Sequence, residues 1–242
     1  MERYYLRIGE TIATLISEPE YHSIAEHAVR FARRQVIDYI EKVPEFKTSY
    51  APLEIKDNAP DIVQSMGRAA FKTNVGPMAA VAGAIAQFAI ESMMDAGASH
   101  VVFDNGGDIA MYLDHPIIVG LYTGTKGPQG LGFKVTRTGT LLGLCTSSAT
   151  IGHSFSFGNT DSSTVYATDV ALADAYATAL GNAVTIPDYT LIESSLRGVM
   201  IPGILGAMVT IDDAVGTCGM LPELVQARVD YDLISKGLGG YE

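Results

Sequence analysis

Apolar residues recur at helical spacing in several long stretches of the chain. Between residues 20 and 43 they lie three or four positions apart and Pro44 follows, which predicts one long amphipathic helix that ends there. The same spacing predicts helices over 61–71 and 170–183, and a shorter one over 191–196. Another predicted helix begins at Gly76-Pro77 and is rich in alanine and glycine, so a second backbone or a ligand can pack very close to it.

Alternating polar and apolar positions predict strands in the rest of the chain. Residues 3–17 alternate on both sides of Gly9-Glu10, which predicts a hairpin. A short apolar strand is expected at 101–103, followed by a meander of short strands between glycine-rich turns. The strands expected in the meander and elsewhere are 109–113, 116–122, 131–136, 140–145, 53–55, 163–168, 205–211 and 216–220. This order predicts an α+β fold in which antiparallel or mixed sheets pack with helices, in a single compact domain over 1–242.

Composition narrows the expected partners and compartment. The net charge is −11 and no basic stretch exists to neutralise phosphates, so we expect no nucleic-acid partner. Cys145 and Cys218 are too few for a disulfide framework, which favours a reducing compartment. Because no signal peptide or uninterrupted membrane-length run is evident, we expect a soluble cytoplasmic protein without a membrane partner. The alanine- and glycine-rich middle suits a homo-oligomer.

An acidic, glycine-paired turn is the first candidate for chemistry. Asn105, Gly106 and Gly107 join two apolar runs, and because Asn and Gly tolerate positive φ they predict a hairpin turn between Asp104 and Asp108. In one interpretation the turn is structural and its carboxylates face solvent. In the other, its backbone N–H groups form an anion nest, or Asn105 and Asp108 hydrogen-bond the polar edge of a ligand.

Asp174 and Thr178 lie four residues apart on a predicted helix, so their oxygens project from one face. Each has an ordinary helical explanation, since an Asp can compensate the helix dipole and a Thr can bond back to its own helix. With a main-chain carbonyl near Met78–Ala79 they would also form a set of hard oxygen donors. Such a set suits Mg²⁺ or Ca²⁺.

A hydroxyl-rich segment precedes that helix. Thr146, Ser147 and Ser148 could hold phosphate, and His153 beside them could move a proton near neutral pH. An ordinary polar loop with an exposed histidine is the alternative.

Together these segments resemble the carboxy-terminal half of the ApbE-like superfamily, whose best-known members transfer a flavin nucleotide onto proteins. Residues 105–108 resemble the family's Asn-x-Gly-Gly-Asp turn, and residues 173–179 resemble its Ala-Asp-Ala-x-Ala-Thr-Ala segment. The resemblance covers residues 75–185, and the stretch 76–84 is similar to a small, largely uncharacterised branch of archaea and anaerobic bacteria. It implies an ApbE-like α+β fold.

The resemblance also implies roles for individual residues. His153 and Asp174 would be catalytic, with His153 as general acid or base, and a small-molecule nucleotide such as FAD would be the ligand. An enzyme of this kind would transfer FMN to a hydroxyl acceptor with the help of Mg²⁺. Asp174 and Thr178 would hold the metal, and the residues expected to bind the nucleotide are Asn105, Gly106, Gly107, Asp108, Thr146, Ser147 and Ser148.

The chain also departs from the family pattern. Ala82 stands at the family's lysine, Gln87 stands at its later aspartate, and no Asp-Pro follows His153. Another nucleotide or a pterin-like substrate is therefore just as compatible, and so is a non-catalytic ligand-binding or accessory protein that kept the scaffold. A serine hydrolase built from Ser147 or Ser148 with His153 and Asp174 would lack the Gly-x-Ser-x-Gly elbow.

Overall fold

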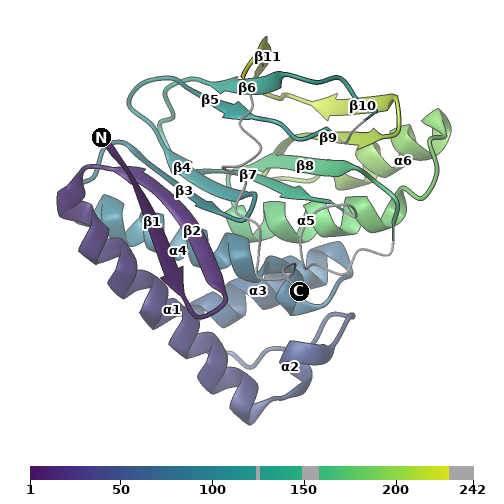
Figure 1. Ribbon diagram of the computed structural model, residues 1–242. Coiled ribbons are helices and arrows are strands. Elements are labelled where there is room, and N and C mark those ends of the chain that lie inside the picture. The colour runs from purple at the N-terminus through teal and green to yellow at the C-terminus, as the bar shows by residue number, and fades with distance from the viewer. Residues whose placement is uncertain (124–125, 149–157, 229–242) are drawn as a thin grey trace, which may run out of the picture.

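The protein is built in layers, with helices on one face of a large sheet and a small sheet over its other face (Figure 1). The structure is a computed structural model that describes residues 1–123, 126–148 and 158–228. The α+β class predicted from the alternation of strands and helices is confirmed.

Within the described residues, the large sheet has eight antiparallel strands. Their spatial order is β1 (Glu2–Ile8), β2 (Thr11–Ser17), β3 (Val101–Asn105), β4 (Asp108–Tyr112), β7 (Leu142–Ser147), β8 (Ser162–Ala167), β9 (Ile204–Ile211) and β10 (Ala214–Gly219). The hairpin predicted over residues 3–17 is confirmed as β1 and β2.

The predicted meander is only partly correct. β4 pairs with β7 and not with the next strand in sequence. The intervening strands β5 (Ile117–Gly120) and β6 (Leu131–Val135) form the small sheet with β11 (Glu223–Gln226), which the sequence pattern did not predict. Short apolar runs show where strands form, but local alternation does not specify which strands pair.

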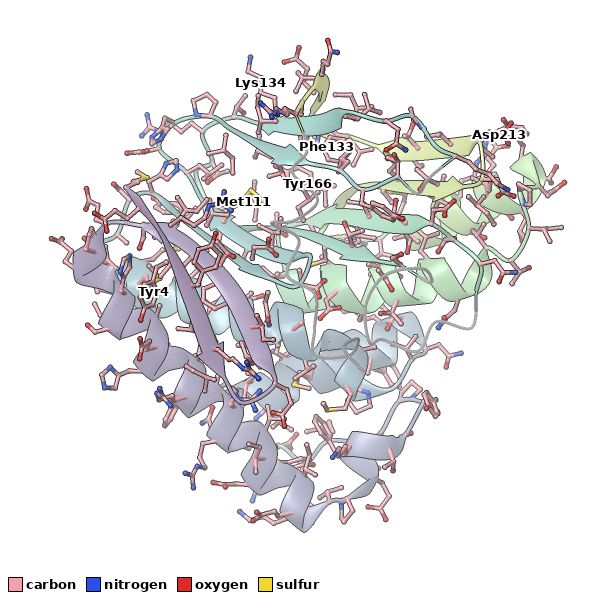
Figure 2. The ribbon with its side chains drawn as sticks, viewed as in Figure 1. Tyr4, Met111, Phe133, Lys134, Tyr166 and Asp213 are labelled. Atoms are coloured by element: carbon pink, nitrogen blue, oxygen red, sulfur yellow. The ribbon has the colours of Figure 1, made fainter. Side chains whose placement is uncertain are left out.

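The central strands are buried on both faces. In β3, Val101 and Phe103 face the helices, whereas Val102 faces the small sheet. Met111 of β4 and Phe133 of β6 belong to the same inter-sheet core, and Figure 2 shows both between the two sheets. Because both faces are covered, β3 and β4 are nearly continuous apolar runs that lead directly into the polar turn between them.

The helices of the first layer are α1 (His22–Lys42), α2 (Glu45–Thr48), α3 (Asp61–Thr73), α4 (Val81–Asp95), α5 (Val170–Ala183) and α6 (Tyr189–Val199). Short 3₁₀ turns, η1 (Pro19–Tyr21) and η2 (Pro77–Ala80), precede α1 and α4. The long helices therefore form where the apolar spacing predicts them.

The strand predicted at residues 53–55 is wrong. This segment is irregular, and its apolar side chains instead pack against the helical core. Ile55 lies over Gly67 of α3, where an added Cβ would come within 2.2 Å of Ile55 Cγ1. The alternation of Leu53 and Ile55 thus reflects side chains packed on a helix.

Among the described residues, one helical segment, Pro77–Asp95, is long and apolar enough to cross a membrane by composition, with a mean hydropathy of 1.3. Half of its most apolar window is buried inside the fold, and α4 packs against α1, α5, β3 and β4. Buried core helices can be equally long and apolar, so this is weak evidence for a membrane segment.

Candidate functional site

The turn between β3 and β4 is the two-residue hairpin that the sequence predicts. Asn105 and Asp108 form its closing pair, and Gly106 and Gly107 have φ of 73° and 100°. Two successive positive φ values match the twist of the flanking strands and favour glycine. The Gly107 N–H donates to Asp104 Oδ1 at 2.9 Å, so this N–H, one of those expected to form the anion nest, already has a carboxylate partner within the chain.

The first turn of α4 connects this hairpin to α5. Asp174 Oδ2 of α5 accepts a hydrogen bond from the Gly83 N–H at 2.8 Å, and Asn105 Nδ2 donates to the Ala82 carbonyl at 3.0 Å. Backbone N–H groups in the first turn of a helix have no partner within the helix and favour a carboxylate. Two predicted site residues, Asn105 and Asp174, therefore meet at the same helix end.

The close approach predicted for the alanine- and glycine-rich helix is confirmed at Gly83. An added Cβ there would lie 2.6 Å from the Val170 carbonyl oxygen and 2.8 Å from Asp174 Cβ. Four residues further on, Gln87 Oε1 accepts the Val170 N–H at 2.9 Å. The glutamine found at the family's aspartate position thus caps the N-terminus of α5.

Asp108 and Asp174 interact electrostatically near this helix end, and Asp104 lies in the adjoining hairpin turn. Burial raises the pKa of Asp174 to about 7, although the N–H groups of Gly83 and Ala82 act in the opposite direction. Burial also raises the pKa of Asp108 well above its ordinary value, and the neighbouring charges of Asp174 and Asp104 add to the effect. The pKa of Asp104 is raised by burial and lowered in part by the Gly107 N–H. Each of these groups therefore resists ionisation more than a solvated carboxylate does.

Cys145 lies beneath the carboxylates. It is fully buried, stands opposite Asp108 in the β4–β7 pairing, and its Sγ donates to the Val170 carbonyl at 3.6 Å. Burial raises the pKa of the thiol well above its usual range, and the charges of Asp108 and Asp174 raise it further. Cys145 is therefore a protonated thiol that supports the site, and not a reactive thiolate.

The end of β7 lies against the hairpin. The Thr146 N–H donates to the Gly107 carbonyl at 3.0 Å, and the hydroxyls of Thr146 and Thr164 are 2.9 Å apart. The Ser147 carbonyl accepts a hydrogen bond from Ser163 Oγ at 3.2 Å, and the same hydroxyl reaches the Ala177 carbonyl of α5 at 2.7 Å. Ser148 follows at the end of β7. The hydroxyl-rich segment is thus placed between the hairpin and α5.

Thr178, Met78, Ala79 and His153 are the remaining predicted site residues. Thr178 is partly exposed one turn after Asp174 on α5, and Met78 and Ala79 lie in η2, which contacts α5. His153 lies outside the described residues, so its role as a general acid or base stays a prediction.

Sequence reasoning did not assign a site role to Asp104, Gly83 or Cys145. Only Asp104 carries a signal in the sequence, because it flanks the glycine pair. Gly83 and Cys145 are placed by pairing between distant segments.

One concavity lies away from these residues. A cavity of about 640 Å³ is lined by the irregular segment 52–57 and by α3, and Gln64, Arg68 and Lys72 are among its lining residues. None of the predicted site residues lines it. The candidate site is therefore defined by its hydrogen bonds and converging charges.

A family model described as "AbpE bacteria" matches residues 6–197. A UPF0280 protein of Methanothrix thermoacetophila is 46% identical over 239 residues, which cover 98% of this chain and 100% of that protein. A UPF0280 protein of Archaeoglobus fulgidus is 43% identical over 243 residues, again with 98% and 100% covered.

Solved structures show the same fold at low sequence identity. The apo form of the Pseudomonas stutzeri flavinyl transferase ApbE aligns with a TM-score of 0.57 at 11% identity, covering 90% of this chain and 93% of that one. The flavin transferase ApbE from Vibrio cholerae aligns with a TM-score of 0.56 at 11% identity, covering 90% and 96%. The ApbE-like fold expected from the sequence is confirmed.

Proposed function

The chain belongs to the AbpE bacteria family, and we propose that it binds a flavin-type nucleotide with a divalent cation where the β3–β4 turn meets α4 and α5. The observation that carries the proposal is the interaction of the Asp108 carboxylate with Asp174, which accepts the Gly83 N–H at the start of α4. The proposed ligand class is supported by solved flavin transferases that share the fold.

The donor set fits a divalent cation. Carboxylate and hydroxyl oxygens are the ligands that Mg²⁺ and Ca²⁺ prefer, and Thr178 follows Asp174 on the same helix face. Burial raises the pKa values of Asp108 and Asp174, and the charge of Asp174 raises that of Asp108 further; a nearby positive charge would offset both effects. A bound divalent cation would supply Lewis-acid polarisation of the phosphates.

Each of the surrounding residues would have a separate role in binding the nucleotide. The Gly106 turn would allow close approach to the ligand, because it is exposed and carries no side chain. Asn105 would fix the hairpin against α4, and Asp108 would face the polar edge of the ligand. The hydroxyls of Thr146, Ser147 and Ser148 would line the phosphate side.

The proposed reaction is transfer of FMN from FAD. A hydroxyl of the acceptor would form a bond to the FMN phosphorus, AMP would leave, and His153 would take the acceptor proton. The alternative is a non-catalytic binding protein. That alternative is favoured by the uncharged Ala82 at the family's lysine and by Gln87, whose side chain caps α5.

Titration with FAD in the presence and absence of Mg²⁺ tests the site. Asp174→Asn keeps an oxygen that can accept the Gly83 N–H and removes the charge, so we expect folded protein with Mg²⁺-dependent FAD affinity at least about tenfold lower, or about 1.4 kcal/mol. Asp213→Asn is the matched control, because Asp213 is an exposed carboxylate of the β9–β10 turn, at the edge of the molecule in Figure 2.

Four outcomes separate the alternatives. No Mg²⁺-dependent FAD binding by the unaltered chain would overturn the flavin assignment, and unchanged binding by Asp174→Asn would remove Asp174 from the cation site. AMP release that is lost in His153→Ala would support the transferase. Tight binding without AMP release would favour the accessory protein.

A further inference from the structure

A second polar cluster lies at the opposite end of β3 and β4 from the glycine turn. His100 immediately precedes β3, and Asp114 and His115 follow β4. The five residues of β3 separate His100 from the turn, a distance of about 16 Å at roughly 3.3 Å per residue. This cluster is therefore independent of the carboxylates around Asp174.

The three side chains converge closely. His100 Nδ1 lies 2.7 Å and His115 Nδ1 lies 2.5 Å from the same oxygen, Asp114 Oδ1. The two imidazole rings stack with centroids 3.7 Å apart and an interplanar angle of 15°. Each of the three residues offers one potential ligand atom, and these three atoms lie within 4.8 Å of one another.

We propose that His100, Asp114 and His115 form a second metal site, for a zinc-class divalent ion. Two imidazole nitrogens and one carboxylate oxygen are donors that first-row transition ions prefer, whereas Mg²⁺ and Ca²⁺ take oxygen ligands. The chain would then carry two cation sites of different chemistry, one with oxygen donors near Asp174 and one with mixed donors at the far end of the same strands.

The geometry requires only a small adjustment to hold such an ion. Bonds from Zn²⁺ to nitrogen and oxygen are about 2.0–2.2 Å, so tetrahedral ligands stand roughly 3.3–3.5 Å apart, somewhat further than the distances to Asp114 Oδ1. The His100 side chain is only 2% exposed and is fixed, while those of Asp114 and His115 are 45% and 54% exposed and can rotate outward.

The exposure of two of the three ligands gives the proposed site access from solvent. Because His115 and Asp114 are exposed, an ion can enter from solvent, and a fourth coordination position would face outward for water or a small ligand. Such an ion would link the segment after β4, at Asp114 and His115, to His100 at the start of β3.

The competing explanation is a hydrogen-bonded cluster in which two neutral histidines share one carboxylate. The variant Asp114→Asn distinguishes the two, because an asparagine oxygen can still accept from both imidazoles but is a much weaker metal ligand. His115→Ala removes an exposed ligand with little effect on packing. His27→Ala is the matched control, since His27 is exposed on α1 and bonds only its own helix, at the Ser23 carbonyl.

The experiment is a calorimetric titration of the metal-stripped full chain with Zn²⁺ in excess Mg²⁺, so that the oxygen site is not available. We expect the unaltered chain and His27→Ala to bind one more Zn²⁺ per chain than His115→Ala and Asp114→Asn, or to bind it at least about tenfold more tightly. Zn²⁺ should also raise the melting temperature of the first two proteins only, and Co²⁺ should give visible absorption only in them.

Equal stoichiometry and affinity in all four proteins would overturn the proposal, as would the absence of Zn²⁺ binding by the unaltered chain. Loss of binding in His115→Ala with full binding in Asp114→Asn would also contradict it, because the carboxylate would then not be a ligand.

Discussion

Gly83 is the residue at which packing and chemistry meet, because its backbone N–H contacts Asp174 and its missing side chain lets α5 approach. Gly83→Ala should lower the free energy of unfolding by about 1–3 kcal/mol, since the added Cβ overlaps the Val170 carbonyl oxygen. The melting temperature should fall by roughly 2–4 °C per kcal/mol, measured by scanning calorimetry. Gly198→Ala is the control, because nothing lies within 4 Å of its added Cβ. Helix propensity makes that change neutral or stabilising by up to about 1 kcal/mol, and equal effects at both glycines would contradict the prediction.

Individual site residues could be predicted from the sequence when their chemistry is unusual for their local setting. Asn105 and Asp108 flank a glycine pair, and Asp174 is the one acidic residue on a mostly apolar helix. The roles of Gly83 and Cys145 could not be predicted this way. Gly83 matters because of a hydrogen bond to a residue 91 positions away, and Cys145 because β4 pairs with β7.

The β3–β4 hairpin is the element on which the proposed ligand site depends. Gly107→Ala places a side chain at φ of 100°, and the strain should lower the free energy of unfolding by about 1–2 kcal/mol. It should also weaken FAD binding in Mg²⁺, because the Gly107 N–H orients Asp104 and its carbonyl accepts from Thr146. Fluorescence titration measures the second effect. Gly139→Ala has open space around its added Cβ and should change neither quantity. An unchanged affinity in Gly107→Ala would place the nucleotide elsewhere.

Helices and strands could be predicted where the local spacing of apolar residues determines the secondary structure. The helical spacing of apolar residues predicted α1, α3 and α5, a run of small residues after Gly76-Pro77 predicted α4, and alternation predicted the first hairpin. Which strands pair depends on packing between distant segments. β5 and β6 are not part of the large sheet but cover its face at Val102, Met111 and Leu144. The strand expected at 53–55 is wrong for a similar reason. Ile55 packs over Gly67 of α3, and the spacing of apolar residues along the sequence does not predict this contact.

At the scale of the molecule, the net charge of −11 and the burial of the carboxylates both oppose ionisation of these carboxylates. Each ionisation at the Asp104, Asp108 and Asp174 cluster adds negative charge to a fold that already repels itself. The same charge attracts cations to both proposed metal sites. We therefore expect cation binding and proton binding to compete at the nucleotide site, which makes pH a test of the whole arrangement.

The folded-state pKa of Asp174 is about 7, above its ordinary value of 3.8, so the folded chain binds this proton more tightly than the unfolded chain. The stability that Asp174 contributes is therefore fully present below about pH 4 and is lost as pH rises through 7. Without divalent cations, Asp174→Asn should gain melting temperature relative to the unaltered chain between pH 5 and pH 8, although the raised pKa of Asp108 leaves part of the dependence in place. Mg²⁺ should stabilise the unaltered chain more at pH 8 than at pH 5, because protons no longer compete for the same oxygens. Parallel melting curves for the two proteins across this range would show that Asp174 is already ionised at low pH.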